Sequence, residues 1–314
     1  MNRATFTALT AAAVLAPRAP GQAQALTTFR FGTTPVESYA LGAYAQEGGF
    51  FKKQGFEAQM SYFNGGGAVI AALVGGALDY ACVNWGATSN AHVKGIPVMA
   101  IAPGGVYTTD SPTTILAVAK NNATAKTGKD LNGKTVGVST LKDLQQAAVM
   151  KWVDSTGGDS STVKFLEIPI PEMPPSLNAG RIDAGIVLEP VLTNAKSEIR
   201  VLAKCYDAIS KKLMICTHLG MKDYLDKNAA QTRKVIAALA ETAAWANANH
   251  EKAGEILAKV SKLPAATIAS MARNEFTDKM DLATIQPVID ASATYKFLDK
   301  TFKAQDLFWQ APRV

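Results

Sequence analysis

The sequence has little of what metal centres and membrane spans need. Its 314 residues include only three histidines, His92, His218 and His250, and their spacing matches no common metal-binding motif. We therefore expect no metal and no other cofactor. After the amino-terminal segment, no apolar run is long enough to cross a bilayer, so we also expect no membrane anchor.

Cysteine is scarce as well. The three cysteines, Cys82, Cys205 and Cys216, are too few for a disulfide framework. Cys82 lies in an apolar run and is interpreted as a small buried hydrophobe. Cys205 and Cys216 could pair in an oxidising compartment or remain two buried free thiols, and their spacing does not distinguish these alternatives. We favour free thiols.

Basic residues are not concentrated anywhere, although the formal net charge is +6. They are spread along the whole chain, and the closest runs are Lys52-Lys53 and Lys211-Lys212. No basic stripe interleaved with aromatic residues is present, which argues against nucleic acid as a partner.

The amino terminus has the three parts of a secretory signal. Arg3 supplies a positive charge, Phe6–Ala16 is an apolar run too short to span a membrane, and Ala23-Gln24-Ala25 fits a peptidase site. No cysteine follows that would carry a lipid. We predict a cleaved signal peptide over residues 1–25 and a mature protein in the periplasm.

Short apolar runs alternate with amphipathic stretches through the first two thirds of the chain. This alternation predicts an α/β fold with mainly parallel sheets covered by helices. The expected strands are Phe29–Thr33, Phe56–Phe63, Leu78–Val83, Pro97–Ala102, Lys134–Val138, Val163–Ile168, Ile182–Leu188 and Arg200–Ala203. The main expected helices are Val36–Gln54, Ala68–Val74, Ala87–Lys94, Lys142–Ser155 and Glu172–Ala179.

The chain contains an internal duplication. The pattern Leu-x-x-Gly-x-x-Asp ends at Asp79 and again at Asp183, an offset of 104 residues. In both copies a short helix ends near the glycine and an apolar strand follows the aspartate. The duplication predicts two similar α/β lobes.

Two further strand-like runs, Thr113–Ala119 and Leu213–Thr217, flank the second copy. The chain after them is helical in pattern, beginning with an expected helix Tyr224–Asn249. Those helices need an apolar surface to cover, and the first lobe is the simplest one. We predict one lobe from residues 26–116 plus 217–314 and another from residues 117–216. The two runs would form a double-strand hinge, with a ligand cleft between the lobes.

Ligands of open parallel sheets bind beyond the carboxyl ends of the strands. The residues expected there are mostly polar, aromatic or glycine, so they can donate hydrogen bonds, stack, or let a ligand approach the backbone. The predicted ligand-binding residues are Thr34, Tyr39, Asn64, Gly66, Gly67, Asn84, Trp85, Thr88, Tyr107, Ser139, Thr140, Gln145 and Glu189.

Several of these residues have an alternative interpretation. Trp85 is either a stacking platform or a packed core aromatic. Glu189 either receives an ammonium or N–H of the ligand or stabilises the start of the following helix. Lys142 is the single cation near the strand-end loops. This predicts a neutral, zwitterionic or amine-bearing ligand rather than a strong anion.

Four segments resemble one known family. They are Ala45–Phe56 (AQEGGFFKKQGF), Ala71–Asp79 (AALVGGALD), Asp130–Val138 (DLNGKTVGV) and Gly180–Pro190 (GRIDAGIVLEP). Together they are similar to signatures of the substrate-binding proteins for nitrate, sulfonate, taurine and thiamine-pyrimidine precursors. The resemblance implies a type II periplasmic-binding-protein fold, closure on a small molecule and delivery to an ABC permease in the inner membrane. It also implies that the loops holding Thr34, Tyr39, Trp85, Thr140 and Glu189 line the cleft.

Two other functions are weighed against transport. A sensory protein that presents its ligand to a membrane receptor would have the same sequence features. A secreted enzyme would need a catalytic group such as Ser139, Asp143 and His218, but no Gly-x-Ser-x-Gly motif is present. The family includes a pyrimidine-synthesising enzyme with a cysteine-rich iron site, and this sequence has no comparable cysteine cluster. We predict a monomeric binding protein without catalytic activity.

Overall fold

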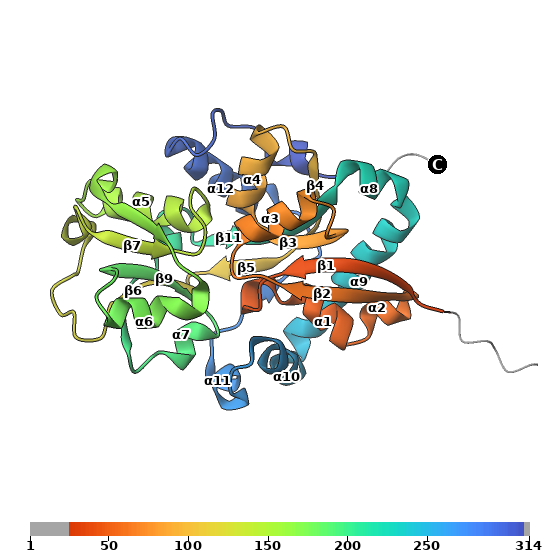
Figure 1. The fold of residues 1–314 in the computed structure, drawn as a ribbon, viewed down its shortest axis with the longest axis horizontal. Coiled ribbons are helices and arrows are strands. Elements are labelled where there is room, and N and C mark those ends of the chain that lie inside the picture. Colours follow the sequence, from red (N-terminus) through yellow and green to blue (C-terminus); the bar gives the residue numbers. More distant parts are fainter. Residues whose placement is uncertain (1–24, 311–314) are drawn as a thin grey trace, which may run out of the picture.

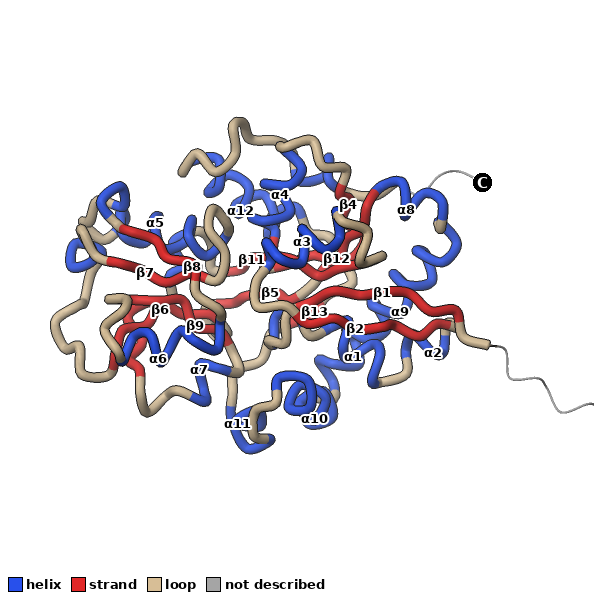
Figure 2. Tube along the Cα trace, viewed as in Figure 1, coloured by secondary structure: helices blue, strands red, loops and turns tan. Residues whose placement is uncertain are grey.

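The computed structural model describes residues 25–310 and shows two α/β lobes lying side by side (Figure 1). All of the predicted signal peptide except its last residue, Ala25, falls outside the described residues. Each lobe contains a five-stranded sheet, and helices lie against the strands (Figure 2).

The first lobe is built on a sheet whose strand order is β2-β1-β3-β12-β4. The strands β1, β2 and β3 run parallel, whereas β12 runs antiparallel to both of its neighbours. Helices cover both faces, because α3 and α4 contact β3 while α1, α2 and α9 pack on β2 and β4. The strands are β1 (Thr27–Thr33), β2 (Phe56–Tyr62), β3 (Tyr80–Asn84), β4 (Val98–Pro103) and β12 (Cys216–Met221).

The second lobe repeats this arrangement with the order β8-β7-β9-β6-β10. The strands β7, β8 and β9 are parallel and correspond to β1, β2 and β3, and β6 takes the antiparallel place of β12. The duplicated sequence therefore folds into two equivalent sheets. The strands are β6 (Thr114–Ala119), β7 (Thr135–Val138), β8 (Lys164–Glu167), β9 (Ala184–Leu188) and β10 (Ile199–Ala203).

The repeated aspartate of the duplication has the same structural task in both lobes. The carboxylate of Asp79 accepts a hydrogen bond of 2.7 Å from the backbone N–H of Arg30 in β1. Asp183 accepts the equivalent bond of 2.9 Å from Thr135 in β7. The motif therefore joins the loop before one strand to the neighbouring strand.

The segments that connect the lobes agree only in part with the expected ones. The expected run Thr113–Ala119 forms β6 inside the second sheet. The expected run Leu213–Thr217 is divided, because Leu213 and Met214 belong to β11 (Lys212–Met214) whereas Cys216 and Thr217 begin β12 of the first sheet. The connection is made by β11 and β5 (Gly105–Thr108), which pair antiparallel, with β13 (Glu275–Phe276) on the other side of β5.

The helices follow the expected alternation with two differences. The expected helix Val36–Gln54 is divided at Gly48-Gly49, where Gly49 has a φ of 79° that ends a helix. The expected helix over residues 224–249 is divided at Asn228. The helices are α1 (Leu41–Glu47), α2 (Phe50–Lys53), α3 (Gly66–Val74), α4 (Trp85–Val93), α5 (Leu144–Ser155), α6 (Met173–Asn178), α7 (Val191–Asn194), α8 (Lys222–Lys227), α9 (Ala229–Ala248), α10 (His250–Ser261), α11 (Ala265–Ser270) and α12 (Leu282–Thr294).

Short 3-10 helices mark several of the loops. They are η1 (Glu37–Tyr39), η2 (Gly128–Leu131), η3 (Ser160–Thr162), η4 (Ile170–Glu172), η5 (Cys205–Ala208) and η6 (Ala304–Leu307). The carboxyl-terminal helices are not confined to one lobe, since α12 contacts both α4 and α5 and α11 contacts α7. Within residues 25–310, no helix has the length and apolar character needed to cross a bilayer.

Candidate functional site

Two helices, one from each lobe, begin next to each other at the lobe interface. Asn84 caps α4, its side-chain oxygen accepting a 2.8 Å bond from the N–H of Ala87. Asp143 caps α5 and accepts bonds from the N–H groups of Gln145 at 2.9 Å and Gln146 at 3.4 Å. The amide of Asn84 also donates to Asp143 Oδ2 at 3.0 Å. The two helix caps are thus bonded to each other across the interface.

The lobes touch through their backbones at two glycines. A Cβ atom on Gly86 would lie 2.3 Å from the backbone nitrogen of Leu144. A Cβ on Gly65 would lie 2.6 Å from the backbone oxygen of Ser139. Both distances are far below ordinary contact, so only glycine permits this approach. The structure therefore describes the two lobes in a closed arrangement.

A second interlobe contact forms around Glu189. The backbone N–H of Glu37 donates to the backbone oxygen of Glu189 at 3.1 Å. The Glu189 carboxylate accepts bonds from the N–H and hydroxyl of Thr193 at 3.0 and 2.9 Å, and from the N–H of Ala272 at 3.4 Å. Burial raises the pKa of this carboxyl group. The bonds to Thr193 are those expected of an acid at the start of α7.

Glu37 is completely buried beside Glu189 but has a base as its partner. Its carboxylate accepts a 2.7 Å bond from Arg273 Nε and a 2.8 Å bond from the hydroxyl of Tyr44. Buried charges are tolerated in proteins when they are paired and hydrogen-bonded in this way.

Asp143 differs from Glu37 because its hydrogen-bond partners are all neutral. Burial raises the pKa of Asp143 to about 7, outweighing the opposite effect of the bonds from Gln145, Gln146 and Asn84. Burial also raises the pKa values of Tyr39 and Tyr206, and the charge of Asp143 adds to the effect on both phenols. A carboxyl group and two neutral phenols therefore share one buried region.

Tyr107 belongs to the connection between the lobes. It lies in β5, and its hydroxyl donates to Asp207 Oδ1 at 2.8 Å. Its ring meets that of Tyr206 edge-on, with 5.3 Å between the centroids. Tyr107 thus orients Tyr206 from the connecting strand.

Two buried polar atoms near the strand ends have no hydrogen-bond partner among the described residues. They are Trp85 Nε1 and Thr113 Oγ1. Trp85 directly follows β3, and Thr113 lies against the end of β9, its backbone oxygen accepting from the N–H of Glu189 at 2.9 Å. Buried polar groups are normally paired in proteins, so these two atoms retain unused hydrogen-bonding capacity.

Two small cavities open at the edges of the interface. One, of about 230 Å³, includes Gly67, Thr140, Lys94 and Lys142. The other, of about 50 Å³, is lined by residues of both lobes and of the segment after α10: Thr34, Pro35, Val36, Asn64, Ile170, Pro171, Pro190, Val191, Ser261 and Leu263. These volumes show how little space the closed lobes leave between them.

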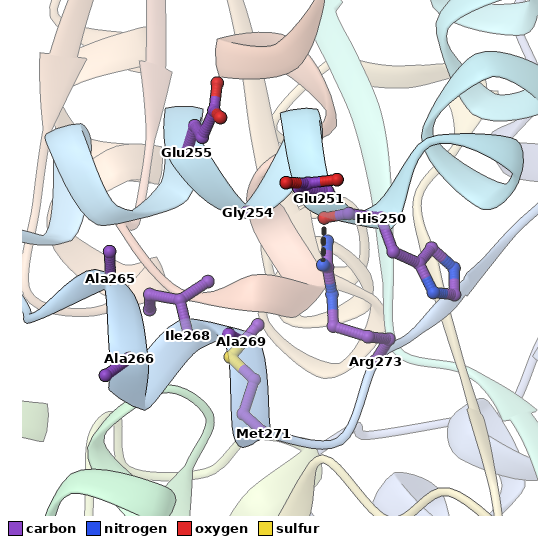
Figure 3. Close-up of a pocket in the computed structure, with 10 residues that line it drawn as sticks. All are labelled: His250, Glu251, Gly254, Glu255, Ala265, Ala266, Ile268, Ala269, Met271 and Arg273. Atoms are coloured by element: carbon purple, nitrogen blue, oxygen red, sulfur yellow. Dashed lines mark hydrogen bonds between the residues drawn. The ribbon is translucent and has the colours of Figure 1, made fainter.

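A cavity of about 690 Å³ lies away from the interlobe strand ends. It is a groove between α10 and α11, where Ile268 packs on Gly254 and Arg273 donates a 2.7 Å bond to the backbone oxygen of His250 (Figure 3). Arg273 is already paired with Glu37, and the other lining side chains that Figure 3 labels are alanines, Met271 and two exposed glutamates. Size alone does not make this groove the functional site.

The predicted ligand-binding residues are divided among three places. Asn84, Ser139, Thr140, Gly66 and Gly67 lie where the lobes touch or beside that contact. Thr34 and Asn64 line the smaller cavity. Tyr39, Tyr107 and Glu189 are buried at the interface or in the connection.

The remaining three predicted ligand-binding residues, Gln145, Thr88 and Trp85, contact residues of their own lobe. Gln145 accepts a bond from the N–H of Ser139, the hydroxyl of Thr88 donates to the backbone of Asn84, and the ring of Trp85 lies 6.3 Å from that of Phe308. The ligand-binding role of all thirteen residues stays a prediction.

Asp143 and Tyr206 are among the interface residues that the sequence analysis did not predict. Asp143 was considered only as a possible catalytic acid, although an aspartate just before an apolar helical run is a typical N-cap. Tyr206 lies beyond the last strand of the second copy, and no feature of its sequence marks it. Its position follows from the folding back of η5 onto α5.

The three cysteines are buried, as the sequence indicated for Cys82. Cys82, Cys205 and Cys216 are buried free thiols, which confirms the favoured alternative. Between residues 25 and 310, no group of three or more potential metal ligands is found. His218 is buried in β12 and is bonded through Nδ1 to the backbone oxygen of Pro103 at 2.9 Å.

Comparison with known families gives one match. The sequence profile of the NMT1/THI5-like family matches residues 38–253, which is more than half of the chain. Comparison with curated protein sequences gave no match.

Solved structures share the fold over nearly the whole length. The periplasmic aliphatic sulphonate binding protein SsuA from Escherichia coli is 20% identical, with a TM-score of 0.71 over 91% of this chain and 93% of that one. SsuA from Xanthomonas axonopodis pv. citri, bound to MOPS, is 17% identical, with a TM-score of 0.76 over 92% and 100%. The nitrate-binding protein NrtA from Synechocystis PCC 6803 is 15% identical, with a TM-score of 0.75 over 90% and 84%. The expected type II periplasmic-binding-protein fold is confirmed.

Proposed function

Since the chain belongs to the NMT1/THI5-like family, we propose that it is the periplasmic solute-binding component of an ABC importer. In this proposal the signal peptide over residues 1–25 directs export, and the monomeric mature protein captures one small organic molecule between its lobes. An inner-membrane permease then receives the molecule. The solute classes considered from the sequence are sulfonates including taurine, pyrimidines, and aromatic or amine-type compounds.

The observation that carries the proposal is the way the lobes meet. They are connected by the short paired strands β5 and β11, and they touch at the strand ends through polar groups such as Asn84 and Asp143. A few short connecting segments can absorb a rigid rotation of one lobe against the other. A solute that contacts both lobes would favour the closed arrangement over the open one.

The arrangement gives no support to the catalytic alternative. A hydrolytic triad of Ser139, Asp143 and His218 would need these side chains bonded to one another. His218 is bonded to Pro103 within the first sheet, and Asp143 is bonded to Asn84 and to its own helix. A sensory role uses the same closure, so it remains the second candidate function.

A ligand screen tests the proposal. The purified mature protein is heated with sulfonates, nitrate, pyrimidines, amines and aromatic acids, each at millimolar concentration. A true solute raises the melting temperature, because it binds the folded state alone. The solute is then incubated with the protein and recovered; we expect it unchanged, and conversion to a product would instead favour an enzyme.

A further inference from the structure

Asp143 is a buried acid without a base. Its side chain is fully buried, its three hydrogen bonds come from Gln145, Gln146 and Asn84, and it is in none of the ion pairs among the described residues. A carboxylate can accept about four hydrogen bonds. When it is ionised, the Asp143 carboxylate therefore has a charge that no basic residue compensates, and it can accept one more hydrogen bond.

Two phenols and one unpaired polar group lie around the contact between Asn84 and Asp143. Tyr39 from the first lobe and Tyr206 from η5 are close enough for the charge of Asp143 to affect them. Trp85 follows Asn84, the residue that donates to Asp143, and its Nε1 is completely buried without a hydrogen-bond partner. This unpaired donor is an observation independent of the carboxylate, and a polar solute that contacts both groups would satisfy them.

The charges at the interface favour one sign of solute. Glu37 is neutralised by Arg273, whereas Glu189 and Asp143 have no basic partner among the described residues. The nearest lysines of the cavity beside this contact, Lys94 and Lys142, are exposed to solvent, where their charges are screened. An anion placed between the lobes would face uncompensated carboxylates, whereas a cation would neutralise one.

On these grounds we infer that Asp143 selects the solute, and that the solute carries a protonated amine or an equivalent cationic N–H donor. The inference rests on the proposed function and narrows it. The donor would bind at the Asp143 carboxylate beside Asn84, with the buried phenols of Tyr39 and Tyr206 nearby. Sulfonates and nitrate would be disfavoured in this part of the interface, in contrast to the ligands named for SsuA and NrtA.

Matched probes of opposite charge test the inference. Dissociation constants are measured by calorimetry for benzylammonium against phenylmethanesulfonate, and for propylammonium against propanesulfonate. A hydrogen bond to a charged group is worth about tenfold or more in affinity. We expect each amine to bind at least about tenfold more tightly than its sulfonate. A sulfonate that binds as tightly as its amine would overturn the inference.

Two variants locate the effect. Asp143→Asn keeps an N-cap residue, so folding should be retained, and we expect it to lose about tenfold or more in amine affinity without weakening sulfonate binding. Asp159→Asn is the matched control, because Asp159 is an exposed aspartate of the same lobe that also caps a short helix, accepting a 3.0 Å bond from the N–H of Ser161. It should change each constant less than about threefold. Equal effects of the two variants on the amine would contradict a selecting role for Asp143.

A second measurement needs no variant. The amine affinity of the wild-type protein should rise between pH 6 and pH 8 as Asp143 ionises, since both amines stay protonated there; a flat profile would count against the inference. X-ray scattering of the same samples separates the two proposals. If the protein becomes more compact with a sulfonate, selection by Asp143 is refuted and capture between the lobes is supported. If an amine binds without making the protein more compact, selection by Asp143 is supported and capture between the lobes is refuted.

Discussion

The Asp143 carboxyl group is neutral or charged according to pH, and its protonation state affects the whole interface. Its pKa of about 7 in the folded chain compares with 3.8 for an unperturbed aspartate. The folded protein therefore holds a proton that the unfolded chain releases between these values. This contribution to stability is present at low pH and is lost as pH rises through about 7.

The first prediction follows from this loss of stability as the pH rises. Asp143→Asn should gain stability relative to the wild type between pH 5 and pH 8, by roughly 3 kcal/mol, because the amide cannot ionise. The free energy of unfolding in urea, measured at both pH values, checks this. Asp159→Asn serves as the exposed control, and a stability difference for Asp143→Asn that does not change with pH would refute the shift.

At the scale of single residues, the sequence predicted the positions of the polar residues better than it predicted their hydrogen-bond partners. It identified Asn84, Thr140 and Glu189 as strand-end residues, and all three are at the interface. It could not show that Glu189 bonds Thr193 and Ala272, because Ala272 comes from a distant part of the chain. The packing of Trp85 against Phe308 depends on tertiary structure in the same way.

At the scale of elements, closure brings the starts of α4 and α5 into direct contact. Gly86 lies in the first turn of α4, against the backbone of Asp143 and Leu144. Backbone atoms cannot move aside as a flexible side chain can, so an added methyl group at this position must hold the helices apart. The open lobes would not be affected, since alanine favours a helix more than glycine does.

Gly86→Ala should therefore impair closure without unfolding the protein. We expect the affinity for the best solute of the ligand screen to fall by about tenfold or more, while the melting temperature of the solute-free protein does not decrease. Gly75→Ala at the end of α3 is the control, because Gly75 has a helical φ of −71° and its added Cβ would meet only backbone oxygens of the same helix, at 3.2 and 3.8 Å. If both variants bind like the wild type, Gly86 is not a closing contact.

The elements themselves were largely predictable, and their interruptions were less so. Hydrophobic runs located the strands of both sheets to within a few residues. The pair Gly48-Gly49 is a strong sequence signal for the end of a helix, whereas no comparable signal marks the division at Asn228. The connecting strand β5 was missed, and β11 was predicted only as part of a longer run that includes the start of β12, because four and three residues are too few to show a period.

At the scale of the whole molecule, the duplication was the most informative feature of the sequence. An offset of 104 residues between two short motifs predicted two similar lobes, and the sheets have equivalent strand orders. How closely the lobes approach could not be predicted, since closure depends on contacts such as Gly86 against Leu144 that join different copies. Rotation about the connection between β5 and β11 is the motion the proposed function requires.

Small-angle X-ray scattering of the purified protein, with and without the best solute of the ligand screen, tests this capture most directly. With saturating solute the scattering curve should match the one calculated from the closed structure described above. Without solute the radius of gyration should be larger, because the lobes separate. The same radius of gyration in both samples, with the solute demonstrably bound, would contradict capture by lobe closure.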